Sequence, residues 1–205
     1  MPSPAESSPT AAAPRVFLNV PYDASYEKIL VALTAALIAL GRDPQLTFQV
    51  PDGGQGRLRR IFDLLSSCPV SIHDLSAVGT PVRFNMPFEL GLACALKEQT
   101  RSHDFLVLER KRHRLDRSLS DLKGIDPKIH GGSARAAIAA ILEVLERSSG
   151  NPTAEQVWQL YRRLHRLLPA LKRQHGRNTL FGSRVYGDLV SLGWIEAQML
   201  GLVDA

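Results

Sequence analysis

The chain is poor in cysteine, and this shortage argues against a metal site. Only two of its 205 residues are cysteines, and neither has the CxxC or CxxH spacing that a metal site built on them would need. Cys68 and Cys94 both lie within apolar stretches. We therefore predict two buried thiols, no metal and a reducing, cytoplasmic location.

A long apolar run and a strong net charge are also missing. The longest run, residues 29–40, is interrupted by Thr34 and falls short of the roughly 20 residues that a membrane span needs. The net charge of +5 is mild for this length, so it permits an acidic partner without predicting nucleic acid. We expect neither a membrane nor a nucleic acid as a partner.

The amino terminus lacks the features of a signal peptide. Residues 1–14 are rich in proline, serine and alanine, and no positively charged segment precedes an apolar one. We therefore predict that this segment is a disordered lead-in.

Strand and helix patterns alternate between residues 15 and 148. Short runs rich in β-branched and aromatic residues predict strands at 15–20, 47–50, 70–74 and 105–108, with a strand-like stretch near 127–130. Helical spacing of apolar residues predicts helices near 26–41, 58–65, 85–99 and 133–147. This alternation predicts an α/β fold, a flavodoxin-like parallel sheet covered by helices on both faces. The pattern does not determine the strand order.

The strand pattern ends at residues 148–152, a plausible domain boundary. Beyond it, apolar residues recur at helical spacing up to Pro169, which we expect to bend or end the first helix, and a second helix is predicted at 185–200. We expect residues 153–205 to form a helical extension. Trp158, Tyr161 and Trp194 predict that it packs on the α/β domain or forms a homo-oligomer interface.

Parallel sheets of this kind bind ligands beyond the carboxyl ends of their strands. That rule selects polar and loop-forming residues after the first three predicted strands, together with the start of the helix at residue 85. The residues after the strands are Asn19, Pro21, Tyr22, Asp23, Asp52, Gly53, Gly54, Asp74 and Ser76.

Glu89 lies about one turn into that helix, because Asn85 is a competent N-cap and Pro87 is tolerated in the first turn. Two interpretations stay open. A glutamate here can simply complement the helix dipole, which contributes about 0.3–1 kcal/mol. Alternatively, apolar neighbours such as Met86 and Phe88 desolvate the carboxylate, which then shares acid and base roles with Asp74 in one crevice.

The segments Ile72-His-Asp-Leu-Ser76 and Arg83-Phe-Asn-Met-Pro-Phe-Glu-Leu-Gly-Leu-Ala93 favour the second interpretation. Together they resemble the nucleoside 2-deoxyribosyltransferase-like and TIR-like domains, which have flavodoxin-like folds, and Val16-Phe-Leu-Asn-Val-Pro-Tyr22 resembles their first strand and its ligand-facing loop. The resemblance covers roughly residues 15–130 and implies that Glu89 is the catalytic glutamate and Asp74 the acidic strand end.

The resemblance implies a hydrolase or transferase that cleaves the N-glycosidic bond of NAD or a related nucleotide or nucleoside, in bacterial defence or signalling. NAD or the nucleotide would be the substrate, so no cofactor is expected. Asp74 or Asp23 would bind ribose or transfer a proton, Arg83 would hold a phosphate, and Tyr22 or Phe88 would stack on a base. The substrate-binding set is Asn19, Pro21, Tyr22, Asp23, Ser76, Arg83, Asn85, Met86 and Phe88.

Other polar residues have weaker patterns. His73 within a strand is most simply structural, and His130 is most simply a loop histidine, although it could reach the crevice. The glycines of residues 52–56 match neither a P-loop nor a GxGxxG motif, so we interpret this segment as a turn bordering the pocket. The basic clusters at 110–114 and 162–166 are most simply solvated surfaces.

Two further functions stay open beside the enzyme. The same crevice could bind a nucleotide signal or assemble partners without turnover. Alternatively, the basic clusters could bind nucleic acid, which would require an affinity that falls steeply with salt.

Overall fold

The computed structural model describes residues 12–50, 54, 56–77, 85–112, 119 and 124–204. Most of the predicted lead-in, the glycine-containing turn apart from Gly54 and Gly56, and most of the polar loop after residue 75 lie outside the described residues. Within the described ranges, no helix is both long and apolar enough to cross a membrane.

The core of the fold is a five-stranded, wholly parallel sheet in the order β2-β1-β3-β4-β5. This is the flavodoxin-like order, in which the chain reverses its direction of winding between β1 and β3. The prediction of a flavodoxin-like α/β fold is confirmed. The strands are β1 Arg15–Asn19, β2 Asp43–Gln45, β3 Val70–Asp74, β4 Asp104–Glu109 and β5 Lys128–Ile129.

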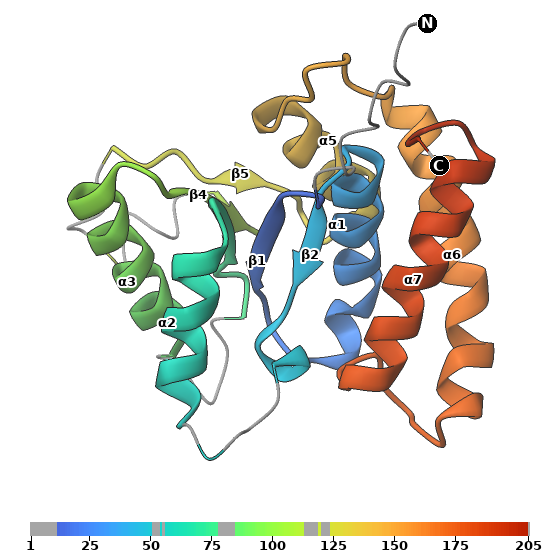
Figure 1. Ribbon diagram of the computed structural model, residues 1–205, viewed down its shortest axis with the longest axis horizontal. Helices are drawn as coiled ribbons and strands as arrows, with labels where there is room; N and C mark the ends of the chain where they lie inside the picture. Colours follow the sequence, from blue (N-terminus) through green and yellow to red (C-terminus); the bar gives the residue numbers. More distant parts are fainter. Residues whose placement is uncertain are drawn as a thin grey trace, which may run out of the picture.

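Helices cover both faces of the sheet (Figure 1). One face carries α2 and α3, the other carries α1 and α5, and α6 and α7 form an additional layer outside α1. Apolar spacing predicted each of these helices to within a few residues. Their bounds are α1 Glu27–Ala39, α2 Arg57–Ser67, α3 Asn85–Thr100, α5 Ala134–Val144, α6 Ala154–Gln174 and α7 Ser183–Met199.

The second predicted strand is wrong. The strand lies at Asp43–Gln45, and the predicted residues instead form a 3₁₀ helix, Thr47–Gln49. Its aromatic residue packs on other aromatic rings, since Phe48 lies edge-on to Tyr22 and Tyr186 at centroid distances of 5.1 and 5.8 Å. The strand-like composition of this segment therefore serves tertiary packing and not strand pairing.

The additional layer explains the composition of α1. Apart from Lys28, every residue of α1 is buried, as expected for a helix that is apolar on all sides. Its outer side meets α6 and α7, and at Gly193 of α7 an added Cβ would lie 2.6 Å from Ile38 Cδ1. The glycine thus permits the close approach of α7 to α1. The C-terminal helices share the main core of the α/β region.

Two smaller expectations differ in part from the structure. Cys68 is buried, whereas Cys94 is only partly buried. Helix α6 does not end at Pro169 but continues through it to Gln174, and the exposed position of this proline leaves the buried face of the helix unbroken.

The prediction that the extension packs on the α/β domain is confirmed, since α6 and α7 contact α1. Tyr161 is buried and stacks on Trp158 at 4.6 Å. The homo-oligomer stays a prediction.

Candidate functional site

The carboxyl ends of β1 and β3 lie side by side at the point where the chain changes winding direction, since Asn19 pairs with His73. The helix that follows β1 covers one face of the sheet, and the helix that follows β3 covers the other (Figure 1). In open α/β sheets this switch point is where ligands bind. Two buried carboxylates, Asp74 and Glu89, lie at this edge.

Asp74 is fully buried on the α1 face and has several hydrogen-bond donors. Its Oδ1 accepts the backbone N–H of Ser76 at 2.8 Å, and its Oδ2 accepts the hydroxyl of Tyr26 and lies 3.0 Å from His130 Nε2. Burial alone would raise the pKa of Asp74, but its hydrogen bonds with His130, Ser76 and Tyr26 outweigh that effect and hold the pKa below its usual value. The carboxylate is thus stabilised in its ionised form.

Asp74, His130 and Ser76 have the composition of a hydrolytic triad but not its geometry. His130 Nε2 lies 3.0 Å from Asp74 Oδ2 and 2.9 Å from Ser76 Oγ, so both partners approach the same nitrogen. The other nitrogen, Nδ1, accepts the N–H of Gly132 at 3.0 Å. A triad requires its acid and its nucleophile on opposite nitrogens. The cluster therefore orients side chains and does not activate Ser76 as a nucleophile.

A cavity of about 280 Å³ lies over this cluster. It opens at the carboxyl ends of the strands, with the loop after β1, the first residues of α1 and the segments after β3, β4 and β5 around it. Its lining residues are Pro21, Asp23, Ser25, Tyr26, Lys28, Ile29, Ser76, Ala77, Arg110, His130 and Gly132.

Glu89 occupies a different environment on α3. Its side chain is only 2% exposed, and its Oε1 lies 3.4 Å from Arg57 Nη2 and 3.5 Å from the side-chain amide of Asn85. Burial raises the pKa of Glu89 above its usual value, while Arg57 and Asn85 offset part of that effect. Asn85, predicted as the N-cap, is the first residue of the helix.

Both contacts of Glu89 use the same oxygen. Among the described residues, Oε2 of Glu89 has no hydrogen-bond partner. Arg57 and Asn85 are the residues that contact Glu89 in the described structure. The ring of Tyr22, after β1, packs instead on Phe48 and Phe181, and burial raises the pKa of its hydroxyl, with a smaller contribution from the charge of Glu89.

The two carboxylates lie on opposite faces of the sheet. Along β3, Ile72 and Asp74 point toward α1, whereas Ser71 and His73 point toward α2 and α3. Glu89 contacts Arg57 of α2, and no contact between Asp74 and Glu89 occurs in the described structure. The two carboxylates thus have different partners, and their pKa values shift in opposite directions. One crevice shared by an acid and a base stays a prediction.

A buried chain of hydrogen bonds supports the Glu89 side. Asn19 Nδ2 donates to the carbonyl of Met86 at 3.2 Å and to His73 Nδ1 at 3.0 Å. His73 must therefore carry its proton on Nε2, which donates to Ser71 Oγ at 2.8 Å, and that hydroxyl donates to His103 Nε2 at 2.8 Å. Burial lowers the pKa of His73 to about 3. The predicted structural role of His73 agrees with this neutral, fully bonded state.

The C-terminal extension contacts the loop after β1. Phe181, on the turn between α6 and α7, stacks on Tyr22 with ring centroids 5.5 Å apart. Glu27, the first residue of α1, accepts the N–H of Leu180 at 2.7 Å and forms an ion pair with Lys172. The extension therefore contacts both the Tyr22 loop and the start of α1 and stabilises their positions.

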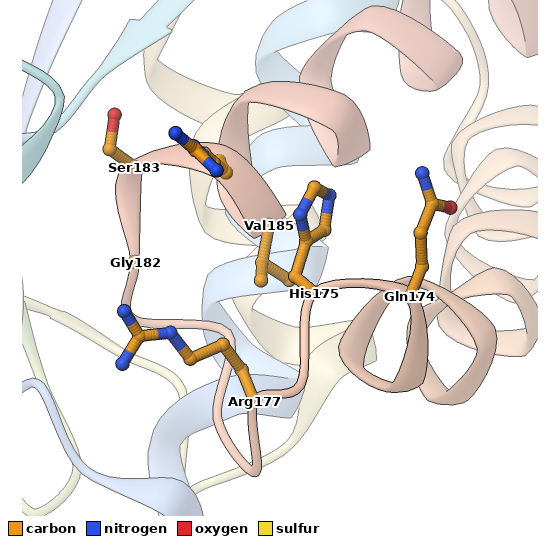
Figure 2. Close-up of a pocket in the computed structure, with 7 residues that line it drawn as sticks. Gln174, His175, Arg177, Gly182, Ser183 and Val185 are labelled. Carbon is orange, nitrogen blue, oxygen red and sulfur yellow. The ribbon is translucent and has the colours of Figure 1, made fainter.

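A second cavity, of about 600 Å³, lies between the end of α6 and the start of α7. Figure 2 shows Arg177 on the connecting turn with its guanidinium extended toward Gly182. His175 Nε2 bonds Asp188 at 2.7 Å beside this cavity. None of the described residues that line it is one predicted for the site. These lining residues are Gln174, His175, Arg177, Gly182, Ser183, Arg184 and Val185.

The predicted substrate-binding residues lie in different surroundings. Pro21, Asp23 and Ser76 line the cavity over Asp74, and Asn19, Asn85 and Met86 lie on the Glu89 side. The ring of Tyr22 packs on Phe48 and Phe181. Phe88 is 55% exposed, and Arg83, Asp52 and Gly53 lie outside the described residues.

Sequence reasoning missed the residues that arrive from distant parts of the chain. Tyr26 and His130 bond Asp74, Arg57 pairs with Glu89, and Lys28 and Arg110 line the cavity. For His130 the sequence favoured a loop histidine and left open a side chain that reaches the crevice, and the structure shows the latter, since His130 lines the cavity. Its position after a strand-like stretch was the local signal. Within the described residues, no group of three or more histidine, cysteine or acidic residues could hold a metal ion.

Neither the known protein-family models nor the curated protein sequences contain a match to this chain.

Proposed function

We propose that the chain cleaves the N-glycosidic bond of NAD or a related nucleotide or nucleoside, with Glu89 as the catalytic residue. One observation carries this proposal. Glu89 is a buried carboxylate at the β1/β3 switch point, with one oxygen held by Arg57 and Asn85 and the other without a partner in the described structure.

Cleavage of an N-glycosidic bond can use a buried carboxylate that has one oxygen without a partner. Cleavage of a ribosyl–base bond passes through a centre with oxocarbenium character, as glycoside hydrolysis does. A carboxylate oxygen beneath the anomeric carbon stabilises that positive charge or forms a covalent intermediate. In Glu89, Arg57 and Asn85 fix Oε1, so Oε2 is the oxygen that would face the sugar. Tyr22 would stack on the base, and Asp74 would act as a positioning residue because its oxygens are already bonded.

The test is the release of nicotinamide or free base. Purified protein is incubated with NAD, nucleotides and nucleosides, and the products are separated by liquid chromatography. We expect release by the wild type and its loss in Glu89→Gln, which keeps the shape but removes the charge. Glu98→Gln is the matched control, because Glu98 is exposed on the same helix. Release that survives in Glu89→Gln contradicts the assignment.

A second function, binding of a nucleotide signal without turnover, is favoured by the ion pair of Glu89 with Arg57 at 3.4 Å. This pair partly neutralises the carboxylate that would otherwise act on the sugar. Saturable nucleotide binding, with the ligand chemically unchanged after long incubation, would support this function over catalysis.

A further inference from the structure

The cavity over Asp74 carries positive charge at its rim. Lys28, in the first turn of α1, and Arg110, which follows β4, both line it. In the described structure neither side chain forms an ion pair. Among the described residues that line the cavity, Asp23 is the one carboxylate beside these two cations.

Arg110 has a defined position above Gly132. An added Cβ at Gly132 would lie 3.2 Å from Arg110 Nε, and the φ of this glycine is +77°. A residue with a side chain would be strained in this backbone conformation and would crowd the guanidinium. The glycine thus leaves room for Arg110 to lie beside the cavity.

The floor of the cavity is polar and rigid. His130 is 2% exposed, and its two ring nitrogens bond Asp74, Ser76 and Gly132. Tyr26 bonds Asp74 from the other side. With a volume of about 280 Å³, the cavity is near the lower end for small-molecule sites. It is large enough for a phosphate or diphosphate group, and its guanidinium matches the geometry of phosphate oxygens.

The carboxyl end of β1 connects this cavity with α3. Pro21 and Asp23, in the loop after β1, line the cavity, and Asn19, the last residue of β1, donates a hydrogen bond to the carbonyl of Met86 in α3 at 3.2 Å. A molecule with a phosphate in the cavity would extend past the end of β1 to bring its sugar toward α3.

We propose that the cavity lined by Lys28 and Arg110 binds the phosphate of the substrate, so that the substrate class is a phosphorylated nucleotide and not a free nucleoside. This inference rests on the proposed function for its substrate, but the phosphate site itself is testable without turnover.

The first experiment compares nicotinamide mononucleotide with nicotinamide riboside, which differ only in the phosphate. We expect the wild type to favour the mononucleotide in kcat/KM, and Arg110→Gln to reduce this preference at least tenfold. Arg177→Gln, with the same change of charge at the α6–α7 cavity, is the control and should keep the preference. Equal turnover of the two compounds by the wild type, or an equal loss of preference in both variants, overturns the inference.

The second experiment separates this inference from the proposed function. Binding of pyrophosphate is measured by titration calorimetry at fixed ionic strength. Saturable binding that weakens at least tenfold in Arg110→Gln and persists in Arg177→Gln supports the phosphate site even if no compound is cleaved. Absence of binding, or weakening only in Arg177→Gln, overturns it, and the latter result would place the anion between α6 and α7.

Discussion

Asp74 and Glu89 are two buried carboxylates at the same edge of one sheet, yet their environments are opposite. Asp74 accepts hydrogen bonds at both oxygens from three parts of the chain. Glu89 has two long contacts to one oxygen. The pKa of Asp74 is lowered, because its bonds outweigh its burial, whereas burial raises the pKa of Glu89.

The number of hydrogen bonds distinguishes a carboxylate that stabilises the fold from one that is available to a ligand. A buried carboxylate with all its donors in place stabilises the fold in its ionised form and has little capacity left for a ligand. A buried carboxylate with an unused oxygen lowers stability, and such a cost is typical of functional sites. This difference supports our proposal that Glu89 is the functional carboxylate, whereas Asp74 links β3 to the residue before α1 and to the turn after β5.

The substitution Asp74→Asn is expected to have the largest effect on stability. The amide cannot accept all the donors that now converge on Asp74, so we expect a loss of about 3 kcal/mol in the free energy of unfolding. Urea denaturation at pH 7 measures this loss. Asp63→Asn is the control, because Asp63 pairs with Arg59 on the exposed side of α2. If Asp74→Asn were as stable as the control, the hydrogen bonds of Asp74 would not stabilise the fold, and the contrast with Glu89 would be wrong.

The effect of Tyr26→Phe should be smaller. It removes the hydroxyl that bonds Asp74 but keeps the buried ring, so we expect a loss of about 1.5 kcal/mol. The pKa of Asp74 should also rise, since a hydrogen bond to its ionised form is lost. NMR titration of the carboxyl carbon measures this change. An unaltered pKa would show that His130 and Ser76 suffice to stabilise the charge.

The smallest effect, and one of opposite sign, is expected for Glu89→Gln. It removes a charge whose burial opposes folding, so we expect a gain of about 1 kcal/mol at pH 7. Thermal denaturation compares it with Glu98→Gln. A loss of stability in Glu89→Gln would mean that the Arg57 pair outweighs the cost of burial.

The free energy of unfolding should depend on pH in opposite ways for Asp74 and Glu89. Because its folded pKa is low, Asp74 contributes stability above the unfolded value of about 3.9, and this contribution disappears as the pH falls through the folded pKa. The folded pKa of Glu89 is raised, so stability is highest below the unfolded value and is lost as the pH rises through the folded pKa. The gain in Glu89→Gln should therefore shrink in acid.

Local patterning accounts for much of the architecture. Alternation and helical spacing predict β1, β3, β4 and the helices, because a strand or a helix must turn its apolar side to one core. The ligand-binding rule for parallel sheets also indicates both carboxylates correctly as residues at the carboxyl edge. These features depend on neighbours a few residues apart, which the sequence displays directly.

Only the folded chain decides which face each carboxylate occupies and which partners it has. Tyr26 and His130 reach Asp74 across 48 and 56 positions of the chain, and Arg57 reaches Glu89 across 32. The second strand was misplaced because Phe48, whose side chain favours a strand, packs on Tyr22 and Tyr186 from a 3₁₀ helix. The pKa of a carboxylate depends on burial and on donors that distant segments supply, and no local pattern encodes those distances.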